Sequence, residues 1–305
     1  MSVKVNQLTK VYGVQHAINN ISFEAHTGQV LGFLGPNGAG KTTTMKILTC
    51  FMPATSGEVT VCGHNVKSDS LEVRRHIGYL PEHNPLYKDM YIKEYLRFVA
   101  GLHKIKAPQK RISEVIELTG LGIESHKQIG QLSKGYRQRV GLAQAIIHDP
   151  KVLILDEPTS GLDPNQIVEI RRVIKELGSQ KTVIFSTHIM QEVQALCDRV
   201  IIINRGNIVA DDKMENLQQR LTGGTIVTVE FGSQVDIKKL QDLPKVRSVN
   251  HLGDNRFQLL APEDTDIRKT LFEFATRNNI ALLEMQREIS SAEDVFAELT
   301  RTATN

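Results

Sequence analysis

The sequence predicts an α/β fold built on a parallel β-sheet, and three observations support that prediction. Short, continuous apolar runs alternate with segments of helical periodicity, which is the pattern of a parallel sheet covered by helices on both faces. A glycine-rich segment, Gly35 to Thr43, lies between one such apolar run and a helical segment. Near residues 221–224 the composition changes, and a second series of strands and helices follows. The prediction is therefore a large α/β domain followed by a smaller α+β domain.

Length, charge and cysteine content exclude several protein classes. The chain has 305 residues, 40% of them apolar and 23% charged, as in globular proteins and unlike disordered ones. A net charge of +3 is too small to indicate nucleic acid as a partner. Three scattered cysteines indicate neither a disulfide framework nor a zinc site. The first ten residues lack the apolar core of a signal peptide. No apolar run reaches the ~18 residues of a membrane span, so any membrane role would need a partner.

The N-terminal part predicts a small antiparallel layer beside the first buried strand. Residues 2–7 and 17–24 alternate between apolar and polar side chains, as strands with one exposed face do. Residues 30–34 form a continuous apolar run that resembles a buried strand, and residues 44–48 resemble the start of a helix. Two further short strands are expected at 58–61 and 77–80.

A largely helical insert is expected at about residues 87–149. Ile92, Tyr95, Leu96 and Val99 follow the i, i+3, i+4, i+7 spacing of an amphipathic helix. Two more amphipathic segments follow, at 109–119 and 137–148.

Three apolar strands, 152–155, 183–185 and 200–203, complete the predicted sheet, and helices at 165–178 and 190–197 separate them. Polar residues follow two of these strands: Asp156 and Glu157 after the first, and His188 after the second. Ligands bind at the carboxyl ends of parallel strands. We therefore expect these side chains to converge with the segment from Gly35 to Thr43.

The first domain is predicted at 1–220 and the second at 225–305, with a linker at Leu221 to Gly224. In the second domain the expected order is strand, helix, strand, strand, helix, strand, which is the ferredoxin-like arrangement. Its segments are 225–231, 235–243, 246–251, 256–261, 266–277 and 280–287, and a last helix is expected at 291–300.

The glycine-rich segment fits the phosphate-loop pattern G-x-x-x-x-G-K-[ST] and has the strand and helix that this motif requires on either side. Glycines let the backbone turn tightly and direct several N–H groups inward, and the helix adds its positive end. Lys41 would reach phosphate oxygens, and the Thr42 hydroxyl would ligate magnesium. The full loop consists of Gly35, Pro36, Asn37, Gly38, Ala39, Gly40, Lys41, Thr42 and Thr43.

Asp156 and Glu157 suit two further parts of phosphoryl-transfer chemistry, namely metal binding and activation of the attacking water. Asp156 is placed to hold magnesium, and Glu157 to polarise a water against the terminal phosphate. His188 could hydrogen-bond that phosphate and sense its loss. The alternative is a pair of acids that caps the next helix, with a histidine that simply ends a strand.

A second anion-binding helix start is expected at Leu132 to Arg139, where Ser133 and Gly135 precede an apolar helical face. It lies about a hundred residues from the phosphate loop. Two phosphate-binding helix starts in one chain suggest that a second subunit completes each site.

Together, Gly35–Thr43, Leu132–Gln138, Leu153–Glu157, Ser160–Asp163 and His188 resemble the ATP-binding subunit of an ABC transporter. The resemblance covers about residues 2–215. It implies a P-loop NTPase core that binds ATP and Mg²⁺, in a head-to-tail homodimer joined to a membrane-spanning permease.

The same resemblance implies roles for individual residues. The loop around Lys41 matches Walker A, Asp156 matches Walker B, and Glu157 matches the catalytic glutamate. Asp163 matches the D-loop, and His188 matches the switch histidine. Ser133 and Gly135 match the signature serine and glycine, and Tyr12 matches the adenine-stacking aromatic. From the sequence alone, a tyrosine in a turn more often packs on the surface than stacks on a base.

Two positions depart from the family pattern. The Q-loop glutamine, which senses magnesium and contacts the membrane subunit, falls on Glu82; a carboxylate can ligate magnesium but cannot donate a hydrogen bond. The signature reads Ser-Lys-Gly-Tyr at 133–136, so Lys134 and Tyr136 are unusual. Lys134 could add charge near phosphate or face solvent.

The runs Ile77 to Leu96 and Leu132 to Val140 closely resemble the ATP-binding subunit linked to gliding motility in some bacteria. The expected function is to power an export-type transporter from the cytoplasmic face of the inner membrane, with the partner near Glu82 to Tyr91. The alternative is a soluble ABC-type ATPase that acts on ribosomes or DNA. Such proteins carry two cassettes or a long coiled coil, whereas this chain has one cassette and no sustained heptads.

Overall fold

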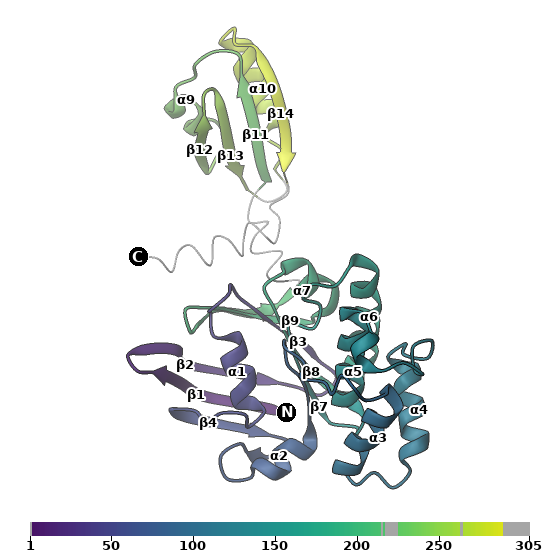
Figure 1. The fold of residues 1–305 in the computed structure, drawn as a ribbon. Helices are drawn as coiled ribbons and strands as arrows, with labels where there is room; N and C mark the ends of the chain where they lie inside the picture. Colours follow the sequence, from purple (N-terminus) through teal and green to yellow (C-terminus); the bar gives the residue numbers. More distant parts are fainter. Residues whose placement is uncertain (1, 215, 217–224, 263–264, 289–305) are drawn as a thin grey trace. The chain divides into compact units, whose positions relative to one another are not determined.

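A computed structural model describes residues 2–214, 216, 225–262 and 265–288 of the chain (Figure 1). The chain divides into two compact units, one within residues 1–214 and the other within residues 215–301. The predicted linker at 221–224 and the predicted helix at 291–300 lie outside the described residues. Within the described ranges, no helix combines the length and apolarity needed to cross a bilayer.

A six-stranded sheet forms the centre of the first unit, in the order β10-β9-β3-β8-β7-β6. Every neighbouring pair is parallel except β9 and the edge strand β10, which are antiparallel. The continuous apolar strands are buried on both faces, which explains why they lack alternation. The strands are β3 (Val30–Leu34), β6 (Ile77–Leu80), β7 (Val152–Asp156), β8 (Thr182–Thr187), β9 (Arg199–Asn204) and β10 (Asn207–Lys213).

The predicted antiparallel layer is present as a second sheet, in the order β2-β1-β4-β5. Its strands are β1 (Val3–Tyr12), β2 (Gln15–Ala25), β4 (Ser56–Val61) and β5 (His64–Asn65). The helix that follows the phosphate loop, α1 (Lys41–Leu48), contributes Met45 and Leu48 to a buried cluster that also holds side chains of β1 and β3. This shared core fixes the start of α1 at the end of β3.

The helical insert contains α3 (Ile92–Leu102), α4 (Pro108–Leu118), a 3₁₀ turn η1 (Ile129–Gln131) and α5 (Lys134–Ile146). Helix α5 begins three residues before the predicted start at Arg137, because the Ser133 side chain accepts a hydrogen bond from the Tyr136 N–H and caps it. Outside the insert lie α6 (Pro164–Gly178) and α7 (Met190–Leu196). A short helix, α2 (Ser70–His76), and strands β5 and β10 were not predicted.

The described residues of the second unit form an antiparallel sheet in the order β12-β13-β11-β14, together with helices α9 and α10. Its elements follow in the order that the sequence predicts: β11 (Thr225–Phe231), α9 (Ile237–Gln241), β12 (Ser248–Gly253), β13 (Arg256–Ala261), α10 (Arg268–Arg277) and β14 (Leu282–Glu288). Its own apolar cluster includes Val229 and Phe231 of β11, Leu240 of α9, and Phe274 of α10.

Candidate functional site

The phosphate loop joins β3 to α1 and is shaped by glycines that no other residue could replace without strain. Gly38 and Gly40 have φ values of 78° and 111°, in the left-handed region that glycine tolerates. A Cβ on Gly40 would lie 2.5 Å from the Ala17 carbonyl oxygen, and a Cβ on Gly35 would lie 2.4 Å from that of Ile203. The loop is thus held against β2 and β9, with its concave side free to receive an anion.

Lys41 is buried and turns back over this loop. Its Nζ donates hydrogen bonds to the carbonyl oxygens of Gly35 at 2.7 Å and Pro36 at 3.2 Å. It also lies 3.4 Å from Glu157 Oε1, as a buried ion pair. A buried ammonium held by the loop and a carboxylate can exchange these partners for phosphate oxygens.

Asp156 ends β7 and is completely buried. Its Oδ1 accepts hydrogen bonds from Ser186 Oγ at 2.5 Å and from Thr42 Oγ1 at 3.2 Å. Its Oδ2 is buried and has no hydrogen-bond partner among the described residues. Burial raises the pKa of Asp156, whereas the hydrogen bonds from Ser186 and Thr42 oppose that shift. An orphaned carboxylate oxygen beside a threonine hydroxyl fits a hard cation such as Mg²⁺.

Glu157 follows in the left-handed conformation, with φ of 49°. Its N–H donates to both the carbonyl oxygen and the Oγ of Ser186, each at 3.1 Å. This clamp directs the carboxylate toward His188, whose Nδ1 lies 2.9 Å and 3.1 Å from the two carboxylate oxygens. Strain of this kind costs about 1–3 kcal/mol and occurs most often at functional sites.

The helix-capping alternative for Asp156 and Glu157 does not hold. The next helix, α6, is capped by Asp163, whose side chain accepts a hydrogen bond from the Gln166 N–H at 3.0 Å. Asp156 and Glu157 instead contact Thr42, Lys41 and His188. The predicted convergence of the phosphate loop with the two strand ends is therefore present in the structure.

These side chains surround a cavity of about 400 Å³. Lys41, Thr42, Glu157 and His188 line it, and so does Glu82, which is exposed. The full lining is Ala17, Asn37, Gly38, Gly40, Lys41, Thr42, Thr43, Glu82, Glu157, Ser160 and His188. Gly35, Pro36 and Ala39 belong to the loop but not to this lining, and the buried Asp156 is not part of it either.

Sequence reasoning missed two residues that hold the site in place. Ser186 contacts both Asp156 and the Glu157 backbone. Glu192, almost fully buried in α7, accepts hydrogen bonds from Thr187 Oγ1 at 2.6 Å and from Thr159 Oγ1. It thereby ties the end of β8, next to His188, to the loop that follows Glu157. The polar run Ser186-Thr187-His188 after an apolar strand was the available signal.

Four other predicted site residues do not line this cavity. Ser133 and Asp163 cap α5 and α6, and Gly135 lies against Gln166. Tyr12 is half exposed, with its hydroxyl on Met52 Sδ at 3.2 Å and Lys10 Nζ 5.2 Å from its ring centre. Lys134 is exposed, and its Nζ would lie 2.2 Å from a Cβ on Gly161, so it reaches over the loop that precedes Asp163.

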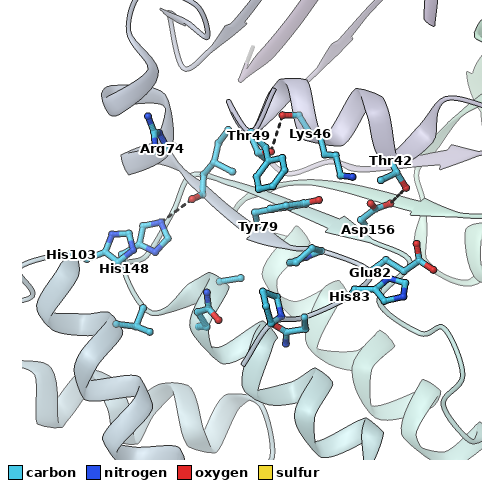
Figure 2. Close-up of a pocket in the computed structure, with 18 residues that line it drawn as sticks. Thr42, Lys46, Thr49, Arg74, Tyr79, Glu82, His83, His103, His148 and Asp156 are labelled. Carbon is cyan, nitrogen blue, oxygen red and sulfur yellow. Dashed lines mark hydrogen bonds between the residues drawn. The ribbon is translucent and has the colours of Figure 1, made fainter. Parts of the chain in front are cut away.

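A second cavity of about 610 Å³ adjoins the first, and Thr42 and Glu82 line both (Figure 2). Figure 2 shows Thr42 and Asp156 at one end and the stacked rings of His103 and His148 at the other. Those rings are 3.9 Å apart, and His148 Nε2 lies 3.0 Å from the Ile77 carbonyl oxygen. The cavity thus extends from the phosphate site to the helical insert.

The chain is similar to known proteins in sequence and in fold. The family model described as ABC transporter matches residues 18–160. The bacitracin transport ATP-binding protein BcrA of Bacillus licheniformis is 39% identical, over 97% of this chain and 96% of that protein. The linearmycin resistance ATP-binding protein LnrL of Bacillus subtilis is 32% identical, over 98% of both chains.

Among solved structures, the dimeric bacterial ABC transporter cassette MJ0796 superposes with a TM-score of 0.64 at 25% identity, over 70% of this chain and 98% of that one. A phosphate loop, two acids and a histidine gathered around one cavity, together with relatives aligned over almost the whole chain, give one conclusion: the chain belongs to the ABC transporter family as an ATP-binding subunit that couples ATP hydrolysis to transport.

Proposed function

We propose that two copies of this chain form a head-to-tail dimer that closes on two ATP molecules and drives a membrane exporter. The observation that carries the proposal is the division of the predicted site. Lys41, Glu157 and His188 surround the cavity, whereas Ser133 and Gly135 lie outside it. A second copy would bring its own Ser133 and Gly135 to the terminal phosphate, and its Asp163 to the edge of the site. The MJ0796 cassette is itself described as a dimer.

In this proposal the residues around the cavity divide the chemistry of hydrolysis. The phosphate loop and Lys41 hold the phosphates, and Tyr12 stacks on the adenine ring. Thr42, Asp156 and Glu82 hold Mg²⁺, which supplies charge neutralisation when bound. Glu157 accepts a proton from the attacking water, and His188 keeps the Glu157 carboxylate in place through its Nδ1 contact. Hydrolysis then removes the phosphate that holds the two copies together.

The export direction is supported by the relatives. BcrA is named for bacitracin transport and LnrL for linearmycin resistance. The link to gliding motility rests only on the sequence runs 77–96 and 132–140 and stays a prediction.

The second cavity is where we place the membrane-spanning partner. Exposed apolar side chains lie among its lining residues and on the adjoining insert: Phe51 is 73% exposed, Tyr87 55% and Leu102 67%. Exposed apolar groups that lie near one another are typical of interaction sites. A partner seated here would contact Glu82 and so sense the phosphate site directly. This contact would hold the chain at the cytoplasmic face of the inner membrane.

Glu157→Gln tests the proposed hydrolysis site. The variant keeps the shape of the side chain but cannot accept the proton, so we expect ATP turnover to fall by roughly 10²–10⁴-fold. ATP binding should persist, and the protein should accumulate as a stable ATP-bound dimer. Phosphate release and light scattering measure the two effects. Normal turnover in this variant would refute the role of Glu157.

Docking is tested with Phe51→Glu and Leu102→Glu, each expressed in the native host and isolated from gently solubilised membranes. We expect both variants to lose most of the multi-span protein that accompanies the wild type, while the ATPase rate of the isolated chain changes less than about twofold, because surface substitutions are mild. Leu283→Glu, at a 62% exposed leucine of the second unit, is the matched control. Copurification with ribosomes or DNA instead would favour the alternative of a soluble mechanical ATPase.

A further inference from the structure

Helices α5 and α6 contact each other close to their first turns, next to the residues proposed to reach the second subunit. Helix α5 starts just after Ser133, and α6 starts just after Asp163. At this junction a Cβ on Gly135 would lie 1.9 Å from Gln166 Oε1, so the glutamine side chain packs directly on the glycine. Beside this contact, Lys134 reaches over Gly161, which lies in the loop before α6. The signature segment (Leu132–Arg139) therefore contacts the D-loop segment (Ser160–Asp163) at Gly161 and the first turn of α6 at Gln166.

An ion pair lies further along the same junction. The Arg139 side chain on α5 is 9% exposed, and it forms a salt bridge with Glu169 on α6, whose side chain is 55% exposed. It also donates to the Gly120 carbonyl oxygen at 3.3 Å and lies 5.1 Å from the Tyr136 ring centre. Gly120 follows α4, so one guanidinium joins α4, α5 and α6. An arginine can bridge several partners because its planar group carries five donors.

The two helices belong to different parts of the first unit. Helix α5 packs with α3 and α4 of the helical insert and also with β6 at the edge of the central sheet. Helix α6 packs with β8 and α7, which also carry the residues that hold Asp156, Glu157 and His188 in place. The Arg139–Glu169 pair therefore connects the insert to the hydrolysis site.

We propose that Arg139 and Glu169 are positioning residues that hold the signature segment and the D-loop segment as one unit, so that a single closing movement presents both to the second ATP site. This inference rests on the proposed head-to-tail dimer. The pair acts only through Ser133, Gly135 and Asp163 and contacts no nucleotide itself. Lys134 strengthens the same link, which accounts for its place in the unusual signature.

The test uses Glu169→Gln in the full chain, in the Glu157→Gln background. Glutamine keeps the side chain's size but removes the charge, leaving Arg139 as a buried cation with weakened pairing. We expect the ATP-dependent dimerisation constant, from sedimentation, to weaken about tenfold, as loss of a charged hydrogen bond does. Affinity of the monomer for a fluorescent ATP analogue should change less than about twofold, since the pair lies outside the cavity. Arg139→Lys, which keeps the charge but loses the fork geometry, should give an intermediate value.

The matched control is Glu176→Gln, which removes the exposed α6 pair with Arg172, 3.9 Å apart. It should leave dimerisation unchanged. Hydrogen exchange on the nucleotide-free chain provides a readout that needs no dimer: amides 134–139 should exchange several-fold faster in Glu169→Gln only. Unchanged exchange, unchanged dimerisation, or an equal loss of monomer affinity would overturn the inference. A parent chain that does not dimerise with ATP would instead overturn the dimer, and this inference with it.

Discussion

Lys41 shows how one residue can serve both the empty and the loaded site. Its ammonium is buried against the carbonyl oxygens of Gly35 and Pro36 and lies 3.4 Å from Glu157. A buried charge is costly unless it is paired. Phosphate oxygens can replace the Glu157 contact, and that exchange would release the Glu157 carboxylate to act on water.

Lys41→Ala should therefore weaken ATP binding rather than only slow turnover. We expect the dissociation constant of the monomer to rise at least about tenfold, because a charge-assisted hydrogen bond contributes about 1.5–3 kcal/mol. Titration with a fluorescent ATP analogue measures it. Lys134→Ala removes a lysine outside the cavity and should leave monomer affinity unchanged. Equal affinities in the two variants would contradict the role given to Lys41.

At the scale of elements, the end of α5 meets α3 and β6 at the stacked pair His103 and His148 (Figure 2). The pKa of His148 is lowered to about 4, chiefly by burial; His103 and Arg111 also lower it, and the Ile77 hydrogen bond and Asp149 oppose the shift. Burial also lowers the pKa of His103. Both rings therefore pack as neutral groups, and protonation of either would place a charge in this junction.

The lowered pKa of His148 makes the free energy of unfolding decrease as the pH falls. Because its folded pKa lies below the ordinary value near 6.5, His148 stabilises the fold fully above that pH and loses this contribution as the pH falls toward about 4. In His148→Gln, whose amide can still donate to Ile77, we expect the loss of unfolding free energy between pH 7 and 4.5 to be about 1–2 kcal/mol smaller than in the wild type. Urea unfolding at both pH values measures it. Parallel pH profiles would show that this junction does not titrate.

Element boundaries show where sequence periodicity is informative. The buried strands of the central sheet were predicted within one or two residues, because continuous apolar runs between turn residues are a strong local signal. The edge strand β10 and the short helix α2 were missed. Strand β10 ends in Asp211, Asp212 and Lys213, and α2 carries Glu72, Arg74 and Arg75, so neither shows an apolar face long enough to detect.

At the scale of the whole molecule, the chain holds separate apolar cores. One cluster joins β1, α1 and β3, and another consists of side chains between Val227 and Ala275. Residues in separate cores contribute to separate cooperative units.

We therefore expect calorimetry of the full chain to resolve two transitions, of which ATP with Mg²⁺ shifts only one. A fragment of residues 1–220 should retain that transition and bind ATP with an affinity within about twofold of the full chain, since distant sites are nearly independent. Residues 225–305 should account for the other transition. A single transition that ATP shifts as a whole would show that the two units unfold together.

The sequence by itself determined the phosphate loop, the acidic strand end at Asp156 and Glu157, the buried strands of the first unit and the order of elements in the second, because glycine spacing and hydrophobic period are properties of short segments. Only the tertiary structure decided which distant side chains meet. Ser186 reaches Asp156 because β7 and β8 pair with those two residues in register. Arg139 forms its ion pair with Glu169, and Ser133 lies outside the cavity of its own chain. Both follow from the packing of α5 against α6, which depends on contacts between residues far apart in the sequence.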